Sequence, residues 1–318
     1  GLLALAWPLL GPAAGGGGGP ACGQEPAAAA FGEGDVSRAR AELAVYKDGP
    51  RALRECAVAA WRRGVAELAG RGLRDVGAAT ESRVLERLGD SGCDALVEDG
   101  SWLNIPRLQE VVLCLPLQGR RLVLEQDGFL RAFDMPTVLW PAGYFLTLWV
   151  AANCGQLAGR VLELGAGVGA PSIAASLCGS NTVLATDKEA HGLVNVRSNA
   201  RINGVNVEAR VLDWHDDAHV DAVAADGPFD VVLGAGLAPP RWAGRLWALL
   251  SRLLRPSGGR AVLCHGVGDV DTSSGSVGDG AFLVERVVPG DDFGLQTRWG
   301  TASEFELLVL RYAGRAEL

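Results

Sequence analysis

Hydrophobic positions in the second half of the chain alternate between short apolar runs and longer helical stripes. Five short runs predict β-strands: residues 161–164, 183–186, 209–212, 230–233 and 261–264. Three stretches with helical periodicity lie between them: residues 172–178, 190–203 and 241–254. Strands that alternate with helices are typical of parallel strands joined by crossover helices. We therefore expect a doubly wound, Rossmann-like α/β sheet.

Two further apolar runs, residues 281–288 and 305–312, follow the alternating pattern. The short segment between them does not hold a crossover helix, so the two runs predict antiparallel pairing at one edge of the sheet. Residues 266–280 are rich in Gly, Ser and Asp and predict a loop where a helix would otherwise precede the next strand.

A hairpin and a helix are predicted ahead of the sheet. The runs 111–115 and 122–125 are separated by Gln118, Gly119 and Arg120, which favours a β-ribbon. Residues 141–153 return to a helical pattern, and Pro141 suits the first turn of that helix. We expect this helix to pack on the sheet.

The chain divides into three predicted parts. Residues 1–34 are rich in Gly, Ala and Pro and lack periodicity, which predicts a disordered tail. Residues 35–109 predict a helical extension, with an apolar stripe over 53–68 and a second helix near 81–88. Residues 110–318, with the ribbon at their start, form the predicted main domain.

Composition narrows the partners. The formal net charge is −8 and no run of basic residues stands clear of acids, which argues against a nucleic acid partner. No stretch approaches the ~20 apolar residues of a membrane helix, so we expect no membrane partner. The seven cysteines form no C-x-x-C pair, and we expect reduced, mostly buried thiols in a cytoplasmic protein, with the nucleus as an alternative. We expect a monomer.

Two histidines, His215 and His219, flank Asp216 and Asp217. On a helix, this spacing would place both imidazoles on one face, as metal ligands require. A solvated acidic loop after a strand explains the segment better, and we expect no metal site.

A glycine-rich turn follows the first predicted parallel strand. It consists of Glu163, Gly165, Ala166, Gly167 and Gly169, and a helix with Pro171 in its first turn comes directly after. Glycines allow a tight turn, and a helix N-terminus offers free N–H groups to an anionic ligand. The same spacing also fits the dinucleotide fingerprint. The motif alone therefore leaves a nicotinamide and an adenosyl cofactor both open.

Asp187 closes the second parallel strand, from which a carboxylate can accept hydrogen bonds from ribose hydroxyls. An Asp in this place also often starts a turn or caps a helix. The distance from the glycine turn favours binding, and it locates a nucleoside without identifying it.

An ordered series of segments resembles methyltransferase family 16, a group of seven-strand methyltransferases that includes many protein-lysine methyltransferases. The segments are residues 139–143, 161–169, 186–187, 195–204 and 212–214. The resemblance extends over about residues 110–312 and implies S-adenosylmethionine as the cofactor, a protein substrate and a terminal antiparallel strand in the sheet. The cofactor-binding residues it implies are Trp140, Glu163, Gly165, Ala166, Gly167, Gly169, Asp187, Asp213, Trp214 and Ala235.

The resemblance also implies a role for each position. Glu163 and the glycines would bind the methionine moiety, and Asp187 the ribose. Asp213 and Trp214 would border the adenine. Trp140 would line the pocket, where an aromatic wall attracts a sulfonium. For Trp140 and Trp214, plain core packing is an equal alternative.

The chain departs from the family after the fourth parallel strand. Members typically carry an acid there and an aromatic residue three positions later, but Gly236 and Pro239 occupy these places. We therefore name no catalytic residue. The sequence predicts a methyltransferase that acts on a lysine side chain of a protein, and a cofactor-binding pseudoenzyme or interaction module as the alternative.

Overall fold

The structure is a computed structural model that describes residues 110–115, 117, 120–126, 138–190, 192–237, 243–256, 258–273, 275–289 and 305–313. The predicted tail (1–34) and helical extension (35–109) lie outside the described residues, as does Pro239. The division into three parts therefore stays a prediction.

The predicted ribbon is confirmed. Strands β1 (Glu110–Cys114) and β2 (Arg121–Glu125) pair antiparallel. Two asparagines of helix α7 (Gly192–Ile202) hold β2 from the side, because the amides of Asn199 and Asn203 each exchange two hydrogen bonds with the backbone of β2, at Glu125 and Val123. One turn of helix matches the two-residue repeat of a strand, so both amides reach the same strand edge.

The main sheet has the predicted doubly wound arrangement. Its order is β5-β4-β3-β6-β7-β10-β9-β8. The parallel strands are β3 (Arg160–Leu164), β4 (Thr182–Asp187), β5 (Glu208–Val211), β6 (Val231–Ala235) and β7 (Arg260–Gly266). Because the order reverses beside β3, the carboxyl ends of β3, β4 and β6 surround a topological switch point, where such sheets bind ligands.

The predicted antiparallel pairing is also confirmed. Strand β10 (Phe305–Tyr312) lies between β7 and β9 (Phe282–Pro289) and runs antiparallel to both. The predicted loop after β7 holds one short strand that the sequence pattern did not show, β8 (Ser276–Val277), which pairs with β9.

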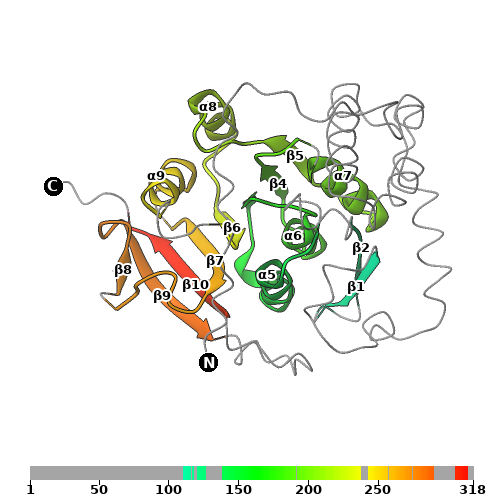
Figure 1. The fold of residues 1–318 in the computed structure, drawn as a ribbon, viewed down its shortest axis with the longest axis horizontal. Helices are drawn as coiled ribbons and strands as arrows, with labels where there is room; N and C mark the ends of the chain where they lie inside the picture. Colours follow the sequence, from blue (N-terminus) through cyan, green and yellow to red (C-terminus); the bar gives the residue numbers. More distant parts are fainter. Residues whose placement is uncertain are drawn as a thin grey trace, which may run out of the picture.

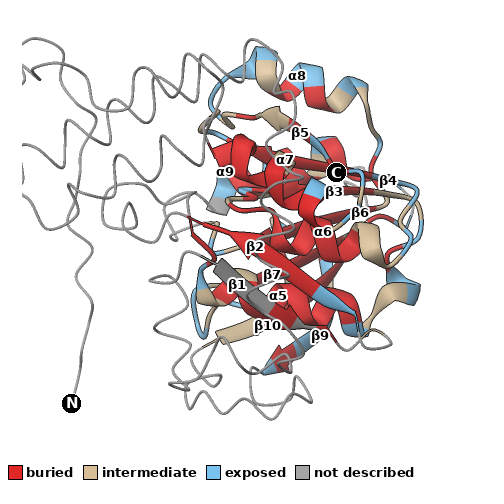
Figure 2. Ribbon diagram, turned by 90° about the vertical axis from the view of Figure 1, so that its right-hand side faces the viewer, coloured by how far each residue is buried: buried red, intermediate tan, exposed pale blue. Residues whose placement is uncertain are grey.

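Helices cover both faces of the sheet (Figure 1). Helices α5 (Pro141–Ala152), α6 (Ala170–Leu177) and α7 pack on one face, and α8 (Asp217–Ala225) and α9 (Ala243–Leu253) on the other. The central strands are therefore buried on both faces (Figure 2). This burial explains why they read as continuous apolar runs rather than as alternating ones. Among the described residues, no helix has the length and apolarity needed to cross a membrane.

The acidic segment after β5 is a helix rather than the predicted loop. The side chain of Asp216 caps α8 by accepting hydrogen bonds from the N–H groups of Ala218 and His219. Val220 and Val223, one helical turn apart, are buried beneath it. His215 precedes the cap, so the two histidines do not share a helix face. In the described part of the chain, no cluster of His, Cys, Asp and Glu could hold a metal.

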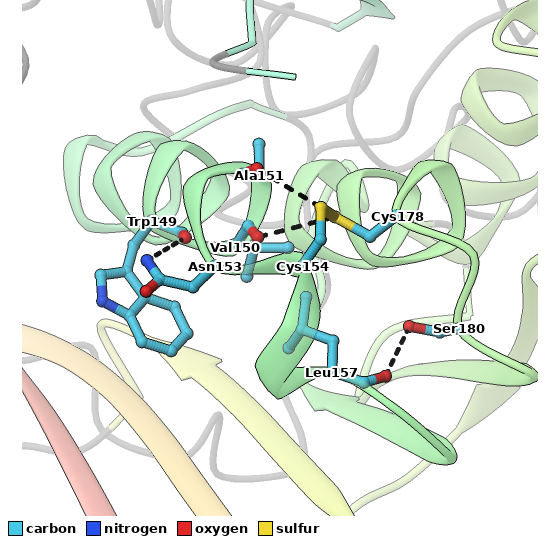
Figure 3. Close-up of a disulfide and its surroundings, with 8 residues drawn as sticks. All are labelled: Trp149, Val150, Ala151, Asn153, Cys154, Leu157, Cys178 and Ser180. Atoms are coloured by element: carbon cyan, nitrogen blue, oxygen red, sulfur yellow. Dashed lines mark hydrogen bonds between the residues drawn. A yellow bond between two sulfur atoms is a disulfide. The ribbon is translucent and has the colours of Figure 1, made fainter. Parts of the chain in front are cut away.

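The prediction of reduced cysteines is wrong for Cys154 and Cys178, which form a disulfide (Figure 3). Cys154 lies in the 3-10 helix η3 (Cys154–Gln156) just after α5, and Cys178 ends α6. The packing of α5 against α6 brings these two helix ends together across 24 residues of sequence. Cys264 in β7 is free and buried, as predicted.

Candidate cofactor site

The glycine turn connects β3 to α6 at the carboxyl edge of the sheet. Gly165, Gly167 and Gly169 have φ values of 63°, 53° and 82°, which side chains other than glycine adopt only at a cost. A Cβ at Gly169 would also lie 3.0 Å from the side chain of Val196. The three glycines therefore let the chain reverse within a few residues and start α6 directly above the end of β3.

Glu163 lies inside this turn and is almost completely buried. Its Oε2 accepts hydrogen bonds from the backbone N–H of Ser172 at 2.9 Å and from the Ser172 hydroxyl at 2.5 Å. Burial raises the pKa of Glu163 to about 8, although the bonds from Ser172 act in the opposite direction. The carboxyl thus fastens the first turn of α6 to β3, and a cation beside it would favour its ionised form.

Asp187 closes β4 beside the glycine turn. Its Oδ2 accepts the Gly167 N–H at 3.0 Å, and its Oδ1 accepts the Glu189 N–H at 3.1 Å. The residue is largely buried. The carboxylate therefore fixes the middle of the glycine turn and stays at the strand end where a ribose is expected.

Asp213 follows on the next strand. The Leu212 N–H donates to the Asp187 carbonyl at 2.8 Å, which brings Asp213 alongside. Partial burial raises the pKa of Asp213, but hydrogen bonds from His215 and the charge of Lys188 outweigh it, and the pKa lies below its usual value. Asp213 is consequently an anion at neutral pH, held at the end of β5.

Trp214 is half-buried and packs against the apolar cluster under α8 and α9. Its carbonyl accepts a hydrogen bond from Arg245 of α9 at 2.7 Å. Core packing thus accounts for part of this side chain, as the alternative reading of the sequence held.

Trp140 and Ala235 border the same edge from two further elements. Trp140 precedes α5 and is 40% exposed. The first turns of α5 lie near the carboxyl end of β7, because Phe145 contacts Phe305, the register partner of Gly266. Ala235 ends β6 one residue beyond the pairing of Gly234 with Leu164, and so lies next to the glycine turn.

The structure therefore gathers the predicted residues at one edge of the sheet. Their roles toward a cofactor stay predictions. Sequence reasoning missed two neighbours of the turn. Ser172 holds Glu163, and its signal is a hydroxyl in the first turn of the helix. Leu237 closes over the strand ends, since a Cβ at Gly165 would lie 2.7 Å and one at Gly234 2.3 Å from its side chain.

Gly236, which replaces the family's acid, has a φ of 62° and is exposed. Among the described residues, a Cβ at this position would meet no atom within 4 Å. The place of the missing acid is therefore open.

Comparison with known proteins supports the family. Residues 117–264, a little under half of the chain, match the family model described as lysine methyltransferase. The match confirms the predicted family over this segment, which runs from the ribbon into β7.

Two curated relatives illustrate the similarity. The electron transfer flavoprotein beta subunit lysine methyltransferase of Rattus norvegicus is 34% identical over 70 residues, which cover 22% of this chain and 28% of the relative. The protein-lysine N-methyltransferase EEF2KMT of Homo sapiens is 29% identical over 136 residues, which cover 38% of this chain and 41% of the relative. The matched region thus spans less than half the length of either relative.

Solved structures show more distant likeness. The ribosomal protein L11 methylase of Lactobacillus delbrueckii subsp. bulgaricus aligns with a TM-score of 0.42 and 18% identity, over 54% of this chain and 78% of that one. The T. thermophilus 16S rRNA N2 G1207 methyltransferase aligns with a TM-score of 0.43 and 16% identity, over 64% and 51%. The fold assignment above rests on the strand order of the chain itself.

Proposed function

We propose that this chain, whose residues 117–264 match the lysine methyltransferase family, is an S-adenosylmethionine-dependent methyltransferase that modifies a lysine side chain of a protein. The observation that carries the proposal is the bond between Asp187 and Gly167, because it joins a carboxylate in the place expected for a ribose ligand to a positive-φ glycine turn at the switch point of the sheet. The relatives above are named as methyltransferases of proteins, which favours this substrate class.

The chemistry of the residues gathered at the site suits the cofactor. The glycine turn would allow close backbone approach, Asp187 would bind the ribose, and Asp213 and Trp214 would border the adenine. Glu163 with its raised pKa is suited to a ligand that brings its own cation, such as an amino-acid ammonium group. Trp140 would offer an aromatic face to the sulfonium.

The cofactor supplies an activated methyl group on a positively charged sulfur. The remaining work of the protein is to align a neutral amine with that methyl group and to keep water away from both. The anchored glycine turn contributes rigidity to this alignment, because Asp187 holds the middle of the turn and Glu163 holds the helix that follows it.

The proposal is tested first by binding. Calorimetric titration is expected to detect binding of S-adenosylmethionine and no binding of NAD. Tight binding of NAD without binding of S-adenosylmethionine would overturn the proposal. Gly167→Arg is expected to abolish binding. Gly204→Arg is a matched control, because Gly204 is exposed at the end of α7 and a Cβ there meets no atom of the described residues within 4 Å.

Methyl transfer is tested next. The chain is incubated with radiolabelled cofactor and either the electron transfer flavoprotein β subunit, the protein named in one relative's description, or a cell extract. Mass spectrometry then locates the modified residue. Labelling of a lysine that Gly167→Arg abolishes supports the proposal, and labelling confined to another atom contradicts the substrate class.

A second candidate is a cofactor-binding pseudoenzyme or interaction module. The observation that favours it is Gly236, which leaves no carboxylate after β6. Binding of S-adenosylmethionine with no methyl transfer to any extract protein would support this candidate over the first.

The remaining properties are proposals of the same kind. We propose a monomer that does not bind nucleic acid, consistent with a net charge of −8, and that acts in the cytoplasm or nucleus. Size-exclusion chromatography and a nucleic acid retention assay test the first two. Fluorescence imaging of the tagged chain tests the third. The Cys154–Cys178 disulfide argues against this third proposal, because disulfides are rare in the reducing cytoplasm and nucleus.

A further inference from the structure

His265 lies near the carboxyl end of β7 and is 8% exposed. Its Nδ1 is 2.8 Å from the carbonyl oxygen of Gly266. A carbonyl oxygen only accepts hydrogen bonds, so Nδ1 carries a ring proton, and in the neutral ring the lone pair is then on Nε2. Within the described residues, the buried Nε2 has no hydrogen-bond partner. A buried acceptor without a donor is costly and needs an explanation.

Glu306 of β10 lies beside the same ring nitrogen, Nδ1. It is the register partner of His265, and its Oε1 lies 3.7 Å from Nδ1. The same oxygen accepts the Gly268 N–H at 3.2 Å. A second carboxylate, Asp269, accepts the Gly266 N–H at 3.0 Å. These contacts fix the loop after β7 around the imidazole and keep its proton on Nδ1.

The position of His265 is adjacent to the place of the missing acid. The Gly236 N–H donates to the carbonyl of Cys264, the residue before His265, at 2.9 Å. Ala261 and Leu263 of β7 lie in the cluster under α8 and α9, so alternation places His265 on that face of the sheet. Among the described residues, a Cβ at Gly236 would meet no atom within 4 Å.

We propose that His265 replaces the lost acid as the catalytic residue that orients the methyl acceptor, with Glu306 as a positioning residue. This inference rests on the proposed function. The lone pair of Nε2 accepts an N–H hydrogen bond from the neutral amine and so directs the amine lone pair toward the methyl group. Because Nε2 is shielded from water, the side chains around it have to shift to admit that amine.

The step balances without a further reactant. The amine nitrogen forms a bond to the methyl carbon, the carbon–sulfur bond breaks, and its electron pair stays on sulfur as a thioether. The nitrogen becomes a methylammonium that keeps its protons until solvent removes one. Its N–H bond to Nε2 strengthens as charge develops on nitrogen, which stabilises the transition state more than the ground state.

A neutral imidazole also differs from the family's acid in one useful respect. A carboxylate stabilises the protonated, unreactive form of an amine. An uncharged acceptor holds the neutral amine without that penalty. In this proposal, the position of Gly236 and Nε2 of His265, which has no hydrogen-bond partner among the described residues, form one site for the amine that accepts the methyl group.

The test uses two ligands that differ in one group. Sinefungin is an S-adenosylmethionine analogue in which a carbon bearing an amine replaces the sulfonium and its methyl group, whereas S-adenosylhomocysteine has no amine there. Both are titrated calorimetrically into the whole chain. Wild type is expected to prefer sinefungin, and His265→Leu is expected to reduce that preference about tenfold, the loss of one hydrogen bond to a charged group. The affinity for S-adenosylhomocysteine is expected to stay within twofold.

Two variants keep the test decisive if His265→Leu folds poorly. His265→Gln retains an acceptor oxygen and is expected to restore part of the preference. Glu306→Gln is expected to lower it about threefold, and Glu285→Gln is its matched control, since Glu285 pairs with Arg260 and Arg311 at the other end of the strands and is expected to change nothing.

Each outcome decides between the two proposals. The role of His265 is overturned if His265→Leu and His265→Gln lose affinity for both ligands equally, or if the preference for sinefungin does not change. The proposed function then still stands. Wild type that binds neither ligand overturns both. Methyl transfer by wild type that falls about 100-fold in His265→Leu at unchanged cofactor affinity supports the role further, by analogy with the loss of one oriented hydrogen bond at a reacting group.

Discussion

The two halves of the sheet's carboxyl edge differ in how many of the residues expected from the family resemblance they contain. The half built on β3 and β4 keeps the glycine turn, Glu163 and Asp187, and these groups are bonded to one another or to α6. The half built on β6 and β7 has lost the expected acid at Gly236, and a histidine lies beside the open position.

This contrast separates binding from transfer. If the proposed function holds, cofactor affinity depends on the first half, where Glu163 and Asp187 are hydrogen-bonded within the protein. Alignment of the acceptor then depends on the second half, where Nε2 of His265 has no hydrogen-bond partner among the described residues. Substitutions in the two halves should therefore affect different measurements, and the predictions below test that separation.

The largest effect is expected from Asp187→Ala. The substitution removes the carboxylate that fixes Gly167 and that is expected to bind two ribose hydroxyls. Hydrogen bonds to a charged group contribute about 1.5–3 kcal/mol each, so we expect a loss of S-adenosylmethionine affinity of about 10³-fold. Isothermal titration calorimetry measures it.

Asp230→Ala is the matched control for this variant. Asp230 accepts the Arg160 N–H at 2.8 Å and pairs with Arg255 at 2.5 Å, at the opposite, amino-terminal edge of the sheet. Asp230→Ala should lower the free energy of unfolding by the modest amount that an exposed ion pair contributes. The affinity for S-adenosylmethionine should stay within about threefold of that of the wild type. Equal loss of affinity in both variants would show that Asp187 acts through stability and not through the ligand.

The next effect concerns the disulfide. Replacing Cys154 and Cys178 by serine removes a crosslink that closes 24 residues. In the chain-entropy model, a loop of this length contributes about 3 kcal/mol, so urea unfolding should show a free energy lower by about that amount. Because both cysteines lie at the ends of α5 and α6 remote from the glycine turn, cofactor affinity should change less than twofold. A change of affinity larger than the change of stability would contradict this separation.

The secondary structure followed from the sequence where packing is simple. The strands β3, β4, β6 and β7 are buried on both faces and therefore stand out as apolar runs, and Pro141 marks the start of α5. Helix α8 was missed because Val220 and Val223 are its only buried residues and its first turn is acidic. Its cap by Asp216 is a local signal that an acidic composition hides.

Contacts between helices and strands were harder to predict from the sequence. Nothing in the spacing of Cys154 and Cys178 indicates a pair, because their meeting depends on how α5 packs against α6. The sequence placed Glu163 toward a ligand, but its bonds to Ser172 appear only once α6 is built above β3. His265 has no motif around it, and its partners come from the loop after β7 and from β10.

A smaller effect is expected from the pH dependence of Glu163. The pKa of this buried carboxyl is raised from 4.5 to about 8, so between these pH values the unfolded chain ionises while the folded chain keeps its proton. Stability should therefore fall as pH rises, by ~1.4 kcal/mol per pH unit at most, or ~2 kcal/mol between pH 6.0 and 7.5.

Glu163→Gln should abolish this part of the pH dependence, as measured by urea unfolding at several pH values. Ser172→Ala should retain it, because burial is the largest cause of the shift and the Ser172 bonds oppose it. If wild type and Glu163→Gln lose stability in parallel between pH 6.0 and 7.5, another group is responsible.

The smallest effect is expected from Gly236→Asp, which returns a carboxylate to the second half of the edge. The positive φ of 62° costs a non-glycine residue about 1–2 kcal/mol, but Asp tolerates it better than most residues. Its Cβ would meet no atom of the described part of the chain within 4 Å. If His265 already orients the acceptor, the new acid duplicates an existing role and favours the protonated amine, so methyl transfer should change less than about threefold at neutral pH, below 1 kcal/mol. A gain of tenfold or more would instead mean that transfer is limited by the lost acid, and that the two halves of the edge differ by a defect rather than by a replacement.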